Sequence, residues 1–463
     1  MVTFILNNKL VSTDQPSGSS LLDYIRYEAG LPGTKIGCRE GDCGACTVLA
    51  GTLTGGVVRY KSVVSCLTPL ANANGKHIVT IEGINTGKLS PVQQAFLDNA
   101  ATQCGFCTPG FIMSLTGEAL SEKQTTPESA VNAISGNICR CTGYKSIERA
   151  AETIATLLKN KEISDPVGWL VRQDYLPGYF LSIPQRLNNL EKKPGVTESE
   201  VVVAGGTDLM VQKAEEIAEK DILSFSDNAG LKSITIEEGV LKIGAATTLN
   251  EIKCSEIVAG FVPGISPYLK LIASEPVRNM ATVAGNIVNA SPIGDFTIML
   301  LALNAEIVTG GTEGTRIIPL NELYAGYKKL TLKKGEYLKT ILVRHRPSFF
   351  SFEKVSKRTH LDIASVNSAV CVDVIGEKII SCSLSAGGVA PVPLFLKKTG
   401  DSLTGVVASA ENVTRAASVL QAEISPISDV RGSDKYKRLL LRQLFFAHMI
   451  KIFPDKLTLN DLV

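Results

Sequence analysis

The sequence predicts a multidomain protein of mixed α and β structure, and three observations support this prediction. The chain has 463 residues, enough for about three domains. Residues 1–85 contain short alternating runs between glycine-dense turns, which is typical of strands. Residues 90–160 contain four short runs with helical periodicity, and residues 176–460 mix both patterns. The pattern therefore changes along the chain, as expected for successive domains of different architecture.

The composition is that of an ordinary globular protein, and it limits the classes of partner that the protein is expected to bind. Hydrophobic residues make up 44% and charged residues 20%, and the net charge is +2. This charge gives no basic field for nucleic acid. No apolar run approaches the ~18 residues of a membrane span, and the start MVTFILNNKLV lacks the features of a signal peptide. We expect a cytoplasmic protein that binds neither nucleic acid nor membrane.

The first 160 residues predict strands followed by a small helical bundle. Strands are expected at residues 2–6, 47–50 and 77–81. Three Ser-Pro or Thr-Pro pairs then predict helix starts, each before a helix-compatible run; the pairs are Ser90-Pro91, Thr108-Pro109 and Thr126-Pro127, and the runs are 92–101, 111–120 and 128–134. A fourth run gathers apolar residues on one helical face, namely Ile147, Ala150, Ala151, Ile154 and Leu158.

The rest of the chain predicts a linker and two further domains. Residues 161–175 are polar and contain Asp165-Pro166, which indicates a linker. Residues 176–345 mix strands, helices and glycine-rich turns. Residues 346–463 begin with strands and continue with helices after Glu411 and Ser433. The expected domains are therefore 1–85, 86–160, 176–345 and 346–463.

Cysteine is concentrated in the first third of the chain. Eight of the 11 cysteines lie within residues 38–141. In a reducing compartment such a concentration indicates metal binding rather than disulfides. Histidine is scarce, with four residues in the whole chain, so sulfur must supply nearly all the ligands. The remaining cysteines are scattered and are expected to be buried small hydrophobes, namely Cys254, Cys371 and Cys382.

The first cysteine group has the spacing of a plant-type [2Fe-2S] site. Cys38, Cys43 and Cys46 follow C-x4-C-x2-C, and Cys66 follows after 19 intervening residues. The loop GCREGDCGAC is rich in glycine, which lets backbone N–H groups point at the sulfurs. A structural zinc site would prefer two CxxC-like knuckles, and only one is present here. A Rieske centre needs two histidines, and only His77 is near.

The second cysteine group consists of two pairs. Cys104 and Cys107 come just before one expected helix, and Cys139 and Cys141 lie in the loop between two others. Four thiolates should thus meet at one end of the bundle. By spacing alone, zinc and [2Fe-2S] remain comparable, because a CxC pair is unusual for either.

Three cysteine motifs resemble those of the molybdenum hydroxylases, the xanthine dehydrogenase family. GCREGDCGACTV (37–48) is similar to the first-cluster motif, and QCGFCTPG (103–110) and GNICRCTGY (136–144) are similar to the second-cluster motifs. The resemblance implies two [2Fe-2S] clusters with these eight cysteines as ligands. It also implies that Gln103 contacts the pterin of the molybdenum cofactor. Arg39 departs from the family, which usually has a small or uncharged residue there; a cation in this position would raise the potential of the first cluster.

Two further segments resemble the FAD domain of the same family. VAGGTDL (203–209) follows an apolar strand, although an ordinary strand turn would look the same and the motif is not GxGxxG. ATVAGNIVNASPIGD (281–295) supplies a glycine and several polar residues. The resemblance implies that the pyrophosphate is held by Ala204, Gly205, Gly206, Thr207, Asp208 and Leu209. It implies that the adenosine-diphosphate part is contacted by Thr282, Gly285, Asn289 and Asp295, and that Lys354 lies near the flavin ring.

The resemblance extends over essentially the whole chain, since SAGGVAPVP (385–393) and residues 424–445 are similar to the family's C-terminal domain. It implies an α+β multidomain fold in four parts. These are a β-grasp [2Fe-2S] ferredoxin domain, a four-helix [2Fe-2S] bundle, an FAD domain of the vanillyl-alcohol-oxidase (VAO/PCMH) type and an α+β C-terminal domain like that of the CO dehydrogenase flavoprotein.

The family's activity implies an electron-transfer subunit of a xanthine dehydrogenase. Hypoxanthine or xanthine would be hydroxylated at molybdopterin on a large partner subunit, which is expected to be a separate polypeptide because the sequence stops at Val463. The family implies an (αβ)2 assembly. Electrons would pass through the two clusters to FAD and then to NAD. No catalytic residue for the hydroxylation is expected on this chain. The alternatives are the same subunit of an aldehyde or N-heterocycle oxidoreductase, a stand-alone flavin–ferredoxin reductase, and a zinc-stapled scaffold.

The run from Lys354 to Ile363 departs from its relatives, which read K-x-S-x-R, one or more acidic residues, then D-I. Asp362 is retained, but the preceding positions hold Thr359, His360 and Leu361. Loss of a carboxylate over the flavin is expected to weaken the use of NAD in favour of oxygen, with His360 adding positive charge below its ordinary pKa of ~6.5.

Overall fold

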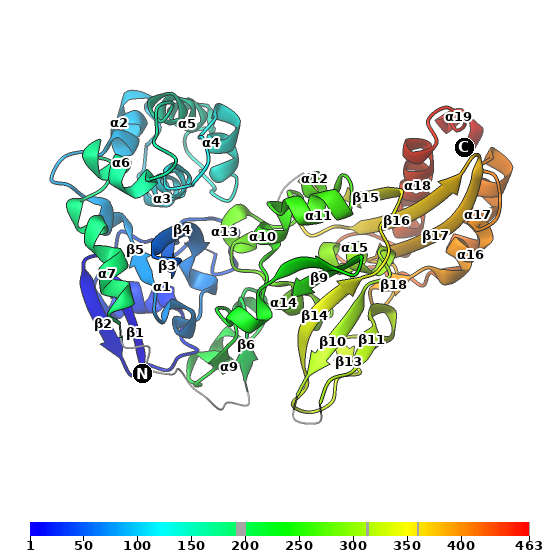
Figure 1. Ribbon diagram of the computed structural model, residues 1–463. Helices are drawn as coiled ribbons and strands as arrows, with labels where there is room; N and C mark the ends of the chain where they lie inside the picture. Colours follow the sequence, from blue (N-terminus) through cyan, green and yellow to red (C-terminus); the bar gives the residue numbers. More distant parts are fainter. Residues whose placement is uncertain (191–200, 312–313, 359–360, 463) are drawn as a thin grey trace. The chain divides into compact units, whose positions relative to one another are not determined.

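The structure is a computed structural model that describes residues 1–190, 201–311, 314–358 and 361–462. The chain forms two compact units. Unit 1 contains residues 1–227 and 273–281, and unit 2 contains residues 228–272 and 282–463. Each unit is described by itself below, and Figure 1 follows the chain through both.

Unit 1 begins with a five-stranded mixed sheet in the order β2-β1-β5-β3-β4. Its strands are β1 (Val2–Leu6), β2 (Lys9–Thr13), β3 (Thr47–Thr54), β4 (Val57–Val64) and β5 (His77–Val79). β1 and β5 are parallel, and the other pairs are antiparallel. Helix α1 (Leu21–Asp23) and the π-helical turn Tyr24–Glu28 follow β2. Phe4, Leu21, Ile25 and Val48 fill the core beneath this sheet and are fully buried.

The three predicted strands are present, and two of them end at a residue other than the expected one. β1 has the expected bounds, and β3 extends past the expected end at Ala50 to Thr54, where the hairpin to β4 turns. β5 stops at Val79 rather than Ile81, because Ile81 begins a 3₁₀ turn whose N-terminal flanking residue is Thr80.

Four helices follow the sheet, as predicted: α2 (Pro91–Asp98), α3 (Thr108–Ala119), α4 (Pro127–Ala133) and α5 (Lys145–Leu157). Ser90 with Gln93 and Thr126 with Ser129 form capping boxes, so these two helices start at the expected residues. The start of α3 differs from the expected one by one residue, since Cys107 is the N-cap and Thr108 is already helical. All five residues of the predicted α5 face are buried.

The expected linker at residues 161–175 contains a helix instead. Asp165 accepts a 2.9 Å hydrogen bond from the N–H of Gly168 and caps helix α6 (Pro166–Arg172). Leu170 is fully buried with the core of the bundle. The buried Lys161 ammonium donates to the carbonyl of Ala119 at the end of α3. This segment therefore packs onto the bundle, and a polar composition with Asp-Pro marked a helix start rather than a flexible connection.

The remainder of unit 1 is made of short elements. They are α7 (Ile183–Asn188), β6 (Val202–Val203), α8 (Leu209–Gln212), α9 (Ala214–Ala218), β7 (Leu223–Ser224) and α13 (Glu275–Arg278). β6 and β7 pair in parallel, and the loop between β6 and α8 is the predicted VAGGTDL turn.

Unit 2 contains a second five-stranded sheet in the order β11-β10-β14-β9-β8. Its strands are β8 (Ile234–Glu237), β9 (Val240–Gly244), β10 (Glu306–Gly310), β11 (Ile317–Pro319) and β14 (Tyr337–Val343), with a small ribbon of β12 (Tyr324–Gly326) and β13 (Lys329–Leu330). The helices of this half are α10 (Leu249–Lys253), α11 (Glu256–Phe261), α12 (Ile265–Leu269), α14 (Val283–Val288) and α15 (Asp295–Ala302).

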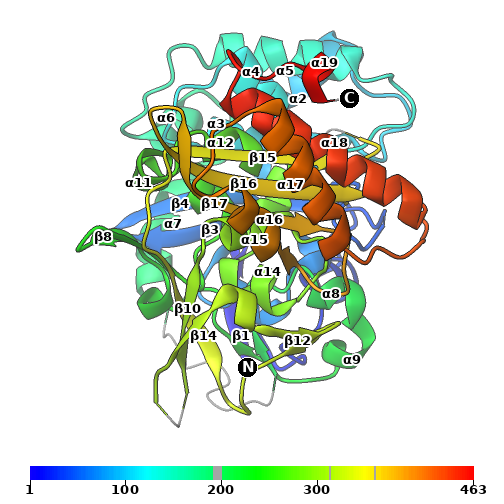
Figure 2. The ribbon, with the colours of Figure 1, turned by 90° about the vertical axis from the view of Figure 1, so that its right-hand side faces the viewer.

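The C-terminal half of unit 2 is a four-stranded antiparallel sheet covered by helices. Its strands are β15 (Phe349–Val355), β16 (Val366–Ile375), β17 (Lys378–Gly387) and β18 (Leu394–Phe395). Its helices are α16 (Lys397–Leu403), α17 (Ala410–Glu423), α18 (Asp434–Ile452) and α19 (Leu459–Leu462). Figure 2 shows α17 and α18 lying across this sheet. Ser433 caps α18, as the sequence predicted.

Helix α15 packs on α14 of its own half and on β16 and β17 of the C-terminal sheet, so it connects the two halves of unit 2. It is apolar around its whole circumference, and Phe296 through Ala302 are buried. Only its first residue, Asp295, is charged. Among the described residues, no helix is long and apolar enough to cross a membrane.

Candidate functional site

The four cysteines of the first group form two thiol pairs within unit 1. Cys38 and Cys43 hydrogen-bond through their thiols, which lowers the pKa of Cys38 to about 5 and raises the pKa of Cys43. Cys46 and Cys66 are paired in the same way, so the pKa of Cys46 is lowered and that of Cys66 is raised. All four predicted cysteines are therefore gathered, with Cys46 and Cys66 buried and the other two half-buried.

The loop around these cysteines turns its backbone donors towards sulfur. Arg39, Gly41 and Gly44 have positive φ angles of 56°, 78° and 66°. The N–H of Glu40 donates to the sulfur of Cys38 at 3.3 Å, and the backbone of Gly41 bonds to Cys66. Left-handed turns of this kind place successive N–H groups on one concave side, which suits an anionic cluster.

The second cysteine group also forms two pairs. The thiols of Cys104 and Cys141 are 3.6 Å apart, and those of Cys107 and Cys139 contact each other. The hydroxyl of Thr142 donates to the sulfur of Cys139 at 3.2 Å. As predicted, one pair of residues precedes α3 and the other lies between α4 and α5. This site is more open, because Cys104 and Cys141 are exposed.

The paired arrangement bears on the choice between zinc and [2Fe-2S]. A tetrahedral zinc ion needs all its ligands around one centre. Two pairs of thiols suit a binuclear cluster, in which each iron takes two protein ligands. The donor sets therefore fit [2Fe-2S] better than zinc at both positions.

A direct hydrogen bond connects the two cysteine groups. The N–H of Ile138, next to Cys139, donates to the carbonyl of Cys43 at 3.0 Å. The buried amide of Asn137 donates to the carbonyl of Gly44 at 3.0 Å and accepts from the hydroxyl of Ser114 at 2.8 Å. The sequence did not single out Asn137, although its place one residue before the Ile138-Cys139 pair is visible in the GNICRC motif.

The predicted pyrophosphate loop lies in unit 1. Gly206 has a positive φ of 82°. A β-carbon on Gly205 would lie 2.1 Å from the carbonyl oxygen of Met280, so glycine is needed there for close backbone packing. Asn72 donates to the carbonyl of Ala204 at 3.0 Å. Within the described part of the chain, the N–H groups of residues 205–207 have no hydrogen-bond partner, which leaves donors for an anionic group.

The other predicted flavin residues lie in unit 2. Thr282 caps α14, where its hydroxyl accepts from the N–H of Gly285 at 3.1 Å. Asn289 accepts from the ammonium of Lys328 at 2.7 Å. Asp295 begins α15 and forms a 2.7 Å ion pair with Lys354 of β15. The structure thus brings Asp295 and Lys354 together.

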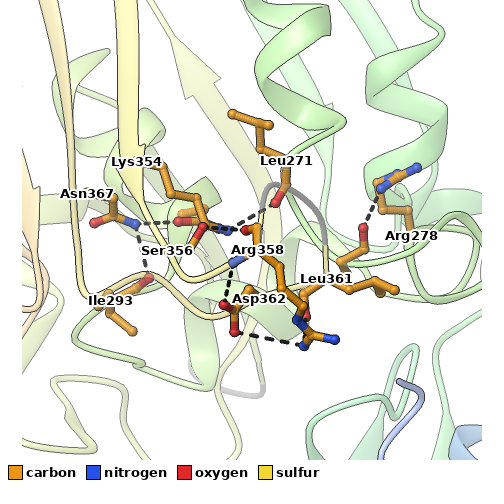
Figure 3. Close-up of polar contacts among 11 residues, drawn as sticks. Leu271, Arg278, Ile293, Lys354, Ser356, Arg358, Leu361, Asp362 and Asn367 are labelled. Atoms are coloured by element: carbon orange, nitrogen blue, oxygen red, sulfur yellow. Dashed lines mark hydrogen bonds and ion pairs between the residues drawn. The ribbon is translucent and has the colours of Figure 1, made fainter. Parts of the chain in front are cut away.

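Asp295 and Lys354 form a buried network with Asn367 (Figure 3). Lys354 and Asn367 are directly opposite each other on β15 and β16. Lys354 also donates to the carbonyl of Leu271 at 3.0 Å, and Asn367 donates to Asp295 and to the carbonyl of Ile293. Burial raises the pKa of Asp295 more than Lys354 and Asn367 lower it.

The sequence analysis did not identify Asn367 as a site residue. The polar Asn-Ser pair at the start of an apolar strand could have indicated it. Its side-chain oxygen is buried and finds no partner among the described residues. A buried acceptor of this kind is costly unless a further group donates to it. Within unit 2, this open acceptor is a feature that would suit a bound polar group.

Arg358 makes hydrogen bonds with Asp362 and Leu361. The N–H of Arg358 donates to the carboxylate at 3.0 Å, and the guanidinium donates to the carbonyl of Leu361 at 3.0 Å (Figure 3). The two positions on which the electron-acceptor prediction depends, Thr359 and His360, lie outside the described residues.

One expectation needs correction. Of the three scattered cysteines expected to be buried, Cys254 is exposed, whereas Cys371 is buried and Cys382 is half-buried. The charge of Arg39, beside the first cysteine group, is paired with Asp23 at 2.7 Å.

Four family models match the chain in order. They are a 2Fe-2S iron-sulfur cluster binding domain (residues 4–71), a [2Fe-2S] binding domain (80–152), an FAD binding domain in molybdopterin dehydrogenase (181–344) and a CO dehydrogenase flavoprotein C-terminal domain (351–452). The chain therefore has the domains for two [2Fe-2S] clusters and FAD.

The chain is also similar to individual known proteins. The chain is 27% identical to a xanthine dehydrogenase of Emericella nidulans over 87% of its own length and 35% of that protein. It is 27% identical to aldehyde oxidase 2 of Mus musculus over 98% of its length and 39% of that protein. A carbon monoxide dehydrogenase chain from Hydrogenophaga pseudoflava is similar in structure, with a TM-score of 0.51 and 27% identity, over 54% of this chain and 88% of that one. The chain thus spans well under half the length of these curated relatives.

Proposed function

We propose that the chain transfers electrons in a xanthine dehydrogenase. The premise of this proposal is that the chain belongs to the molybdenum hydroxylase family as its iron–sulfur and FAD portion. Hypoxanthine or xanthine would be hydroxylated at a molybdopterin centre on a partner polypeptide, in an (αβ)2 assembly in the cytoplasm. NAD is the proposed final acceptor. When bound, the clusters carry single electrons and FAD exchanges one or two, which suits a change from one-electron to two-electron chemistry.

Each cysteine group holds one cluster in this proposal. Cys38, Cys43, Cys46 and Cys66 hold the first, and Cys104, Cys107, Cys139 and Cys141 hold the second. The N–H group of Glu40 and the hydroxyl of Thr142 donate to ligand sulfurs in the two groups, which stabilises negative charge. Ala204–Leu209 in unit 1 and Thr282, Gly285, Asn289, Asp295 and Lys354 in unit 2 are the proposed FAD residues.

The observation that carries the proposal is the hydrogen bond from Ile138 to Cys43. It connects the backbone of a first-group ligand to the residue preceding the second-group ligand Cys139. Only covalent bonds and one 3.0 Å hydrogen bond separate the two sets of sulfurs along this route. The buried Asn137 holds the two loops against each other. Such a rigid, continuous connection is what two electron carriers in series require.

The end of the bundle near Cys104 and Cys141 is the proposed contact with the molybdopterin partner. Phe106, Ile138 and Tyr144 are 48%, 39% and 39% exposed beside these exposed cysteines. Gln103 is exposed on the same loop and is the proposed pterin contact. Apolar side chains around an open ligand set indicate a surface that a partner covers.

The function is tested on the complex isolated from its host with a tag on this chain. We expect a molybdenum-containing polypeptide to co-purify, and xanthine added without oxygen to bleach the flavin and iron–sulfur absorption. Bleaching by an aldehyde or an N-heterocycle instead would assign the subunit to another molybdenum hydroxylase, as the similarity to aldehyde oxidase 2 allows. A monodisperse chain that NADH reduces and that passes electrons to ferredoxin without a molybdenum partner would overturn the proposal.

The acceptor is tested by turnover with NAD and with oxygen, in the native enzyme and in His360→Asp. We propose that loss of an acidic residue before Asp362 weakens the use of NAD. A strong preference for NAD that the substitution leaves unchanged would contradict this part of the proposal.

A further inference from the structure

Arg39 places a positive charge directly beside the first cysteine group. It follows Cys38 in the chain and adopts a positive φ of 56°, which is uncommon for a residue with a side chain. Its guanidinium lies close enough to Cys66 to interact electrostatically with a thiolate there, as the proposed ligand assignment requires. An unpaired cation at this place would favour the more negative, reduced state of a bound cluster and raise its midpoint potential.

Asp23 engages this guanidinium with both carboxylate oxygens. The two terminal nitrogens of Arg39 donate to Oδ2 and Oδ1 of Asp23 at 2.9 and 2.7 Å. Two parallel charge-assisted bonds of this kind fix both distance and orientation. Arg26 lies near Asp23 as well, but its guanidinium donates to the carbonyls of Pro32 and Thr34. Arg39 is therefore the cation that Asp23 binds directly.

Asp23 is itself held by the start of helix α1. The hydroxyl of Ser20 donates to Oδ2 of Asp23 at 2.7 Å and accepts from its N–H at 3.1 Å. Leu21 and Leu22 on this helix are fully buried, which anchors it in the sheet domain. A fixed carboxylate thus meets a side chain that leaves the cysteine loop from a strained backbone position.

We propose that Asp23 and Arg39 form a charge-compensated clamp that positions the Cys38–Cys46 loop and cancels the effect of the Arg39 charge on the midpoint potential of the first cluster. The inference rests on the proposed ligand assignment of Cys38, Cys43, Cys46 and Cys66. It makes Asp23 and Arg39 positioning residues, since neither touches the reacting atoms.

The test is a redox titration of the purified complex, with the two reduced cluster signals followed by electron paramagnetic resonance. Asp23→Asn leaves the cation uncompensated, so the first midpoint should rise. Arg39→Gln leaves the carboxylate uncompensated, so the first midpoint should fall. The double variant should return towards the native value. Both side chains are between a third and a half exposed, so water screens them. Each shift should therefore stay below a tenfold change in the oxidised-to-reduced ratio, which is about 59 mV for one electron.

Two controls separate this inference from the proposed function. The second cluster's midpoint should not move in any variant. Arg59→Gln removes an exposed arginine that pairs with Glu122 instead, and it should leave both midpoints unchanged. Iron content and the presence of both signals report on the ligand assignment, whereas only the midpoints report on the clamp. If Arg39→Gln loses iron, Asp23→Asn decides alone. An unchanged midpoint in Asp23→Asn, or shifts of the same sign in both single variants, would overturn the clamp.

Discussion

The α-carbon of Gly110 lies so close to the carbonyl oxygen of Gly44 that a β-carbon on Gly110 would be 2.3 Å from that oxygen. Gly110 is in the first turn of α3, and Gly44 is in the loop of the first cysteine group. The same carbonyl accepts the amide of Asn137. The two cysteine-bearing domains are therefore in backbone contact at a place where only glycine fits.

Gly110→Ala is expected to disrupt this contact, because the added methyl group meets backbone that cannot move without displacing the cysteine loop. We expect a loss of stability of about 1–3 kcal/mol, as for an overpacked core. Gly117→Ala on the same helix is the matched control. Its β-carbon would meet the flexible end of Leu49 at 3.1 Å and make an ordinary contact with Ser62 at 3.6 Å. Alanine is also the better helix former, so the change should stay within about 1 kcal/mol of zero. Thermal unfolding of the two variants measures the difference, and equal effects would show that the contact is not rigid.

Asn137→Ala tests the second link between the cysteine-bearing domains. The substitution leaves the carbonyl of Gly44 and the hydroxyl of Ser114 buried without this partner, which costs about 1–3 kcal/mol. Ser114→Ala removes only the bond to the side-chain oxygen of Asn137 and should cost less. Urea unfolding followed by the iron–sulfur absorption measures both. A larger effect of Ser114→Ala would place the main link elsewhere.

Cys43→Ser tests the ligand assignment. Two [2Fe-2S] clusters correspond to about four iron atoms per chain, and loss of one ligand should lower this towards about two while FAD stays bound. Cys254→Ser is the control, because Cys254 is exposed and outside both cysteine groups. Iron and flavin assays on the two purified variants give the answer, and an iron content that Cys43→Ser leaves unchanged would contradict the first-cluster assignment.

Lys354→Met leaves Asp295 buried without its cation. Breaking a buried ion pair costs about 3–5 kcal/mol. Adding Asp295→Asn should recover part of this loss, because the amide carries no charge. Lys451→Met removes a half-exposed lysine that pairs with the neighbouring Glu353 at 3.2 Å and should cost less than about 1 kcal/mol. Thermal stability and retained FAD are measured in all three variants; a tolerated Lys354→Met that keeps its FAD would remove Lys354 from the proposed flavin site.

The fully buried His448 predicts an acid-sensitive C-terminal unit. Burial lowers the pKa of His448 to about 3, and its ring bonds to Ser368 and Ser351 at 2.7 and 2.9 Å. The unfolded chain binds a proton below pH ~6.5, whereas the folded chain does not, so stability falls as pH drops from ~6.5 towards 3. Each histidine of this kind contributes up to about 1.4 kcal/mol per pH unit.

His448→Gln should therefore flatten the pH dependence of hydrogen exchange in β16 and α18 between pH 6 and 4, even if it lowers stability at pH 8. His77 in unit 1 has a pKa lowered to about 4 by burial. His77→Gln should flatten the dependence in β5 instead. Identical profiles for the native chain and His448→Gln would show that this histidine does not control the acid response.

The sequence predicted the parts of the fold that local signals determine. Capping residues such as Ser90 and Thr126 act within one turn, so they placed two helix starts correctly. Spacing along one loop and the resemblance to a known family identified the eight cysteines. The features that were predicted wrongly depend on packing. The segment that contains Asp165-Pro166 was predicted to be a linker, whereas its Leu170 is buried in the core. The hydrogen bond between Asn367 and Asp295 depends on the register of the strands. The pairing of Arg39 with Asp23 depends on the fold, because these residues are 16 positions apart in the sequence.

The unequal exposure of the two cysteine groups has a consequence for maturation of the protein. Cys46 and Cys66 are buried in the core of the sheet domain, so we expect a cluster at the proposed first position to enter only while the cysteine loop is open. Cys104 and Cys141 are exposed, so we expect a cluster at the proposed second position to be inserted also on the folded chain. Because ligation and folding are coupled, we expect the first cluster to be inserted before the second.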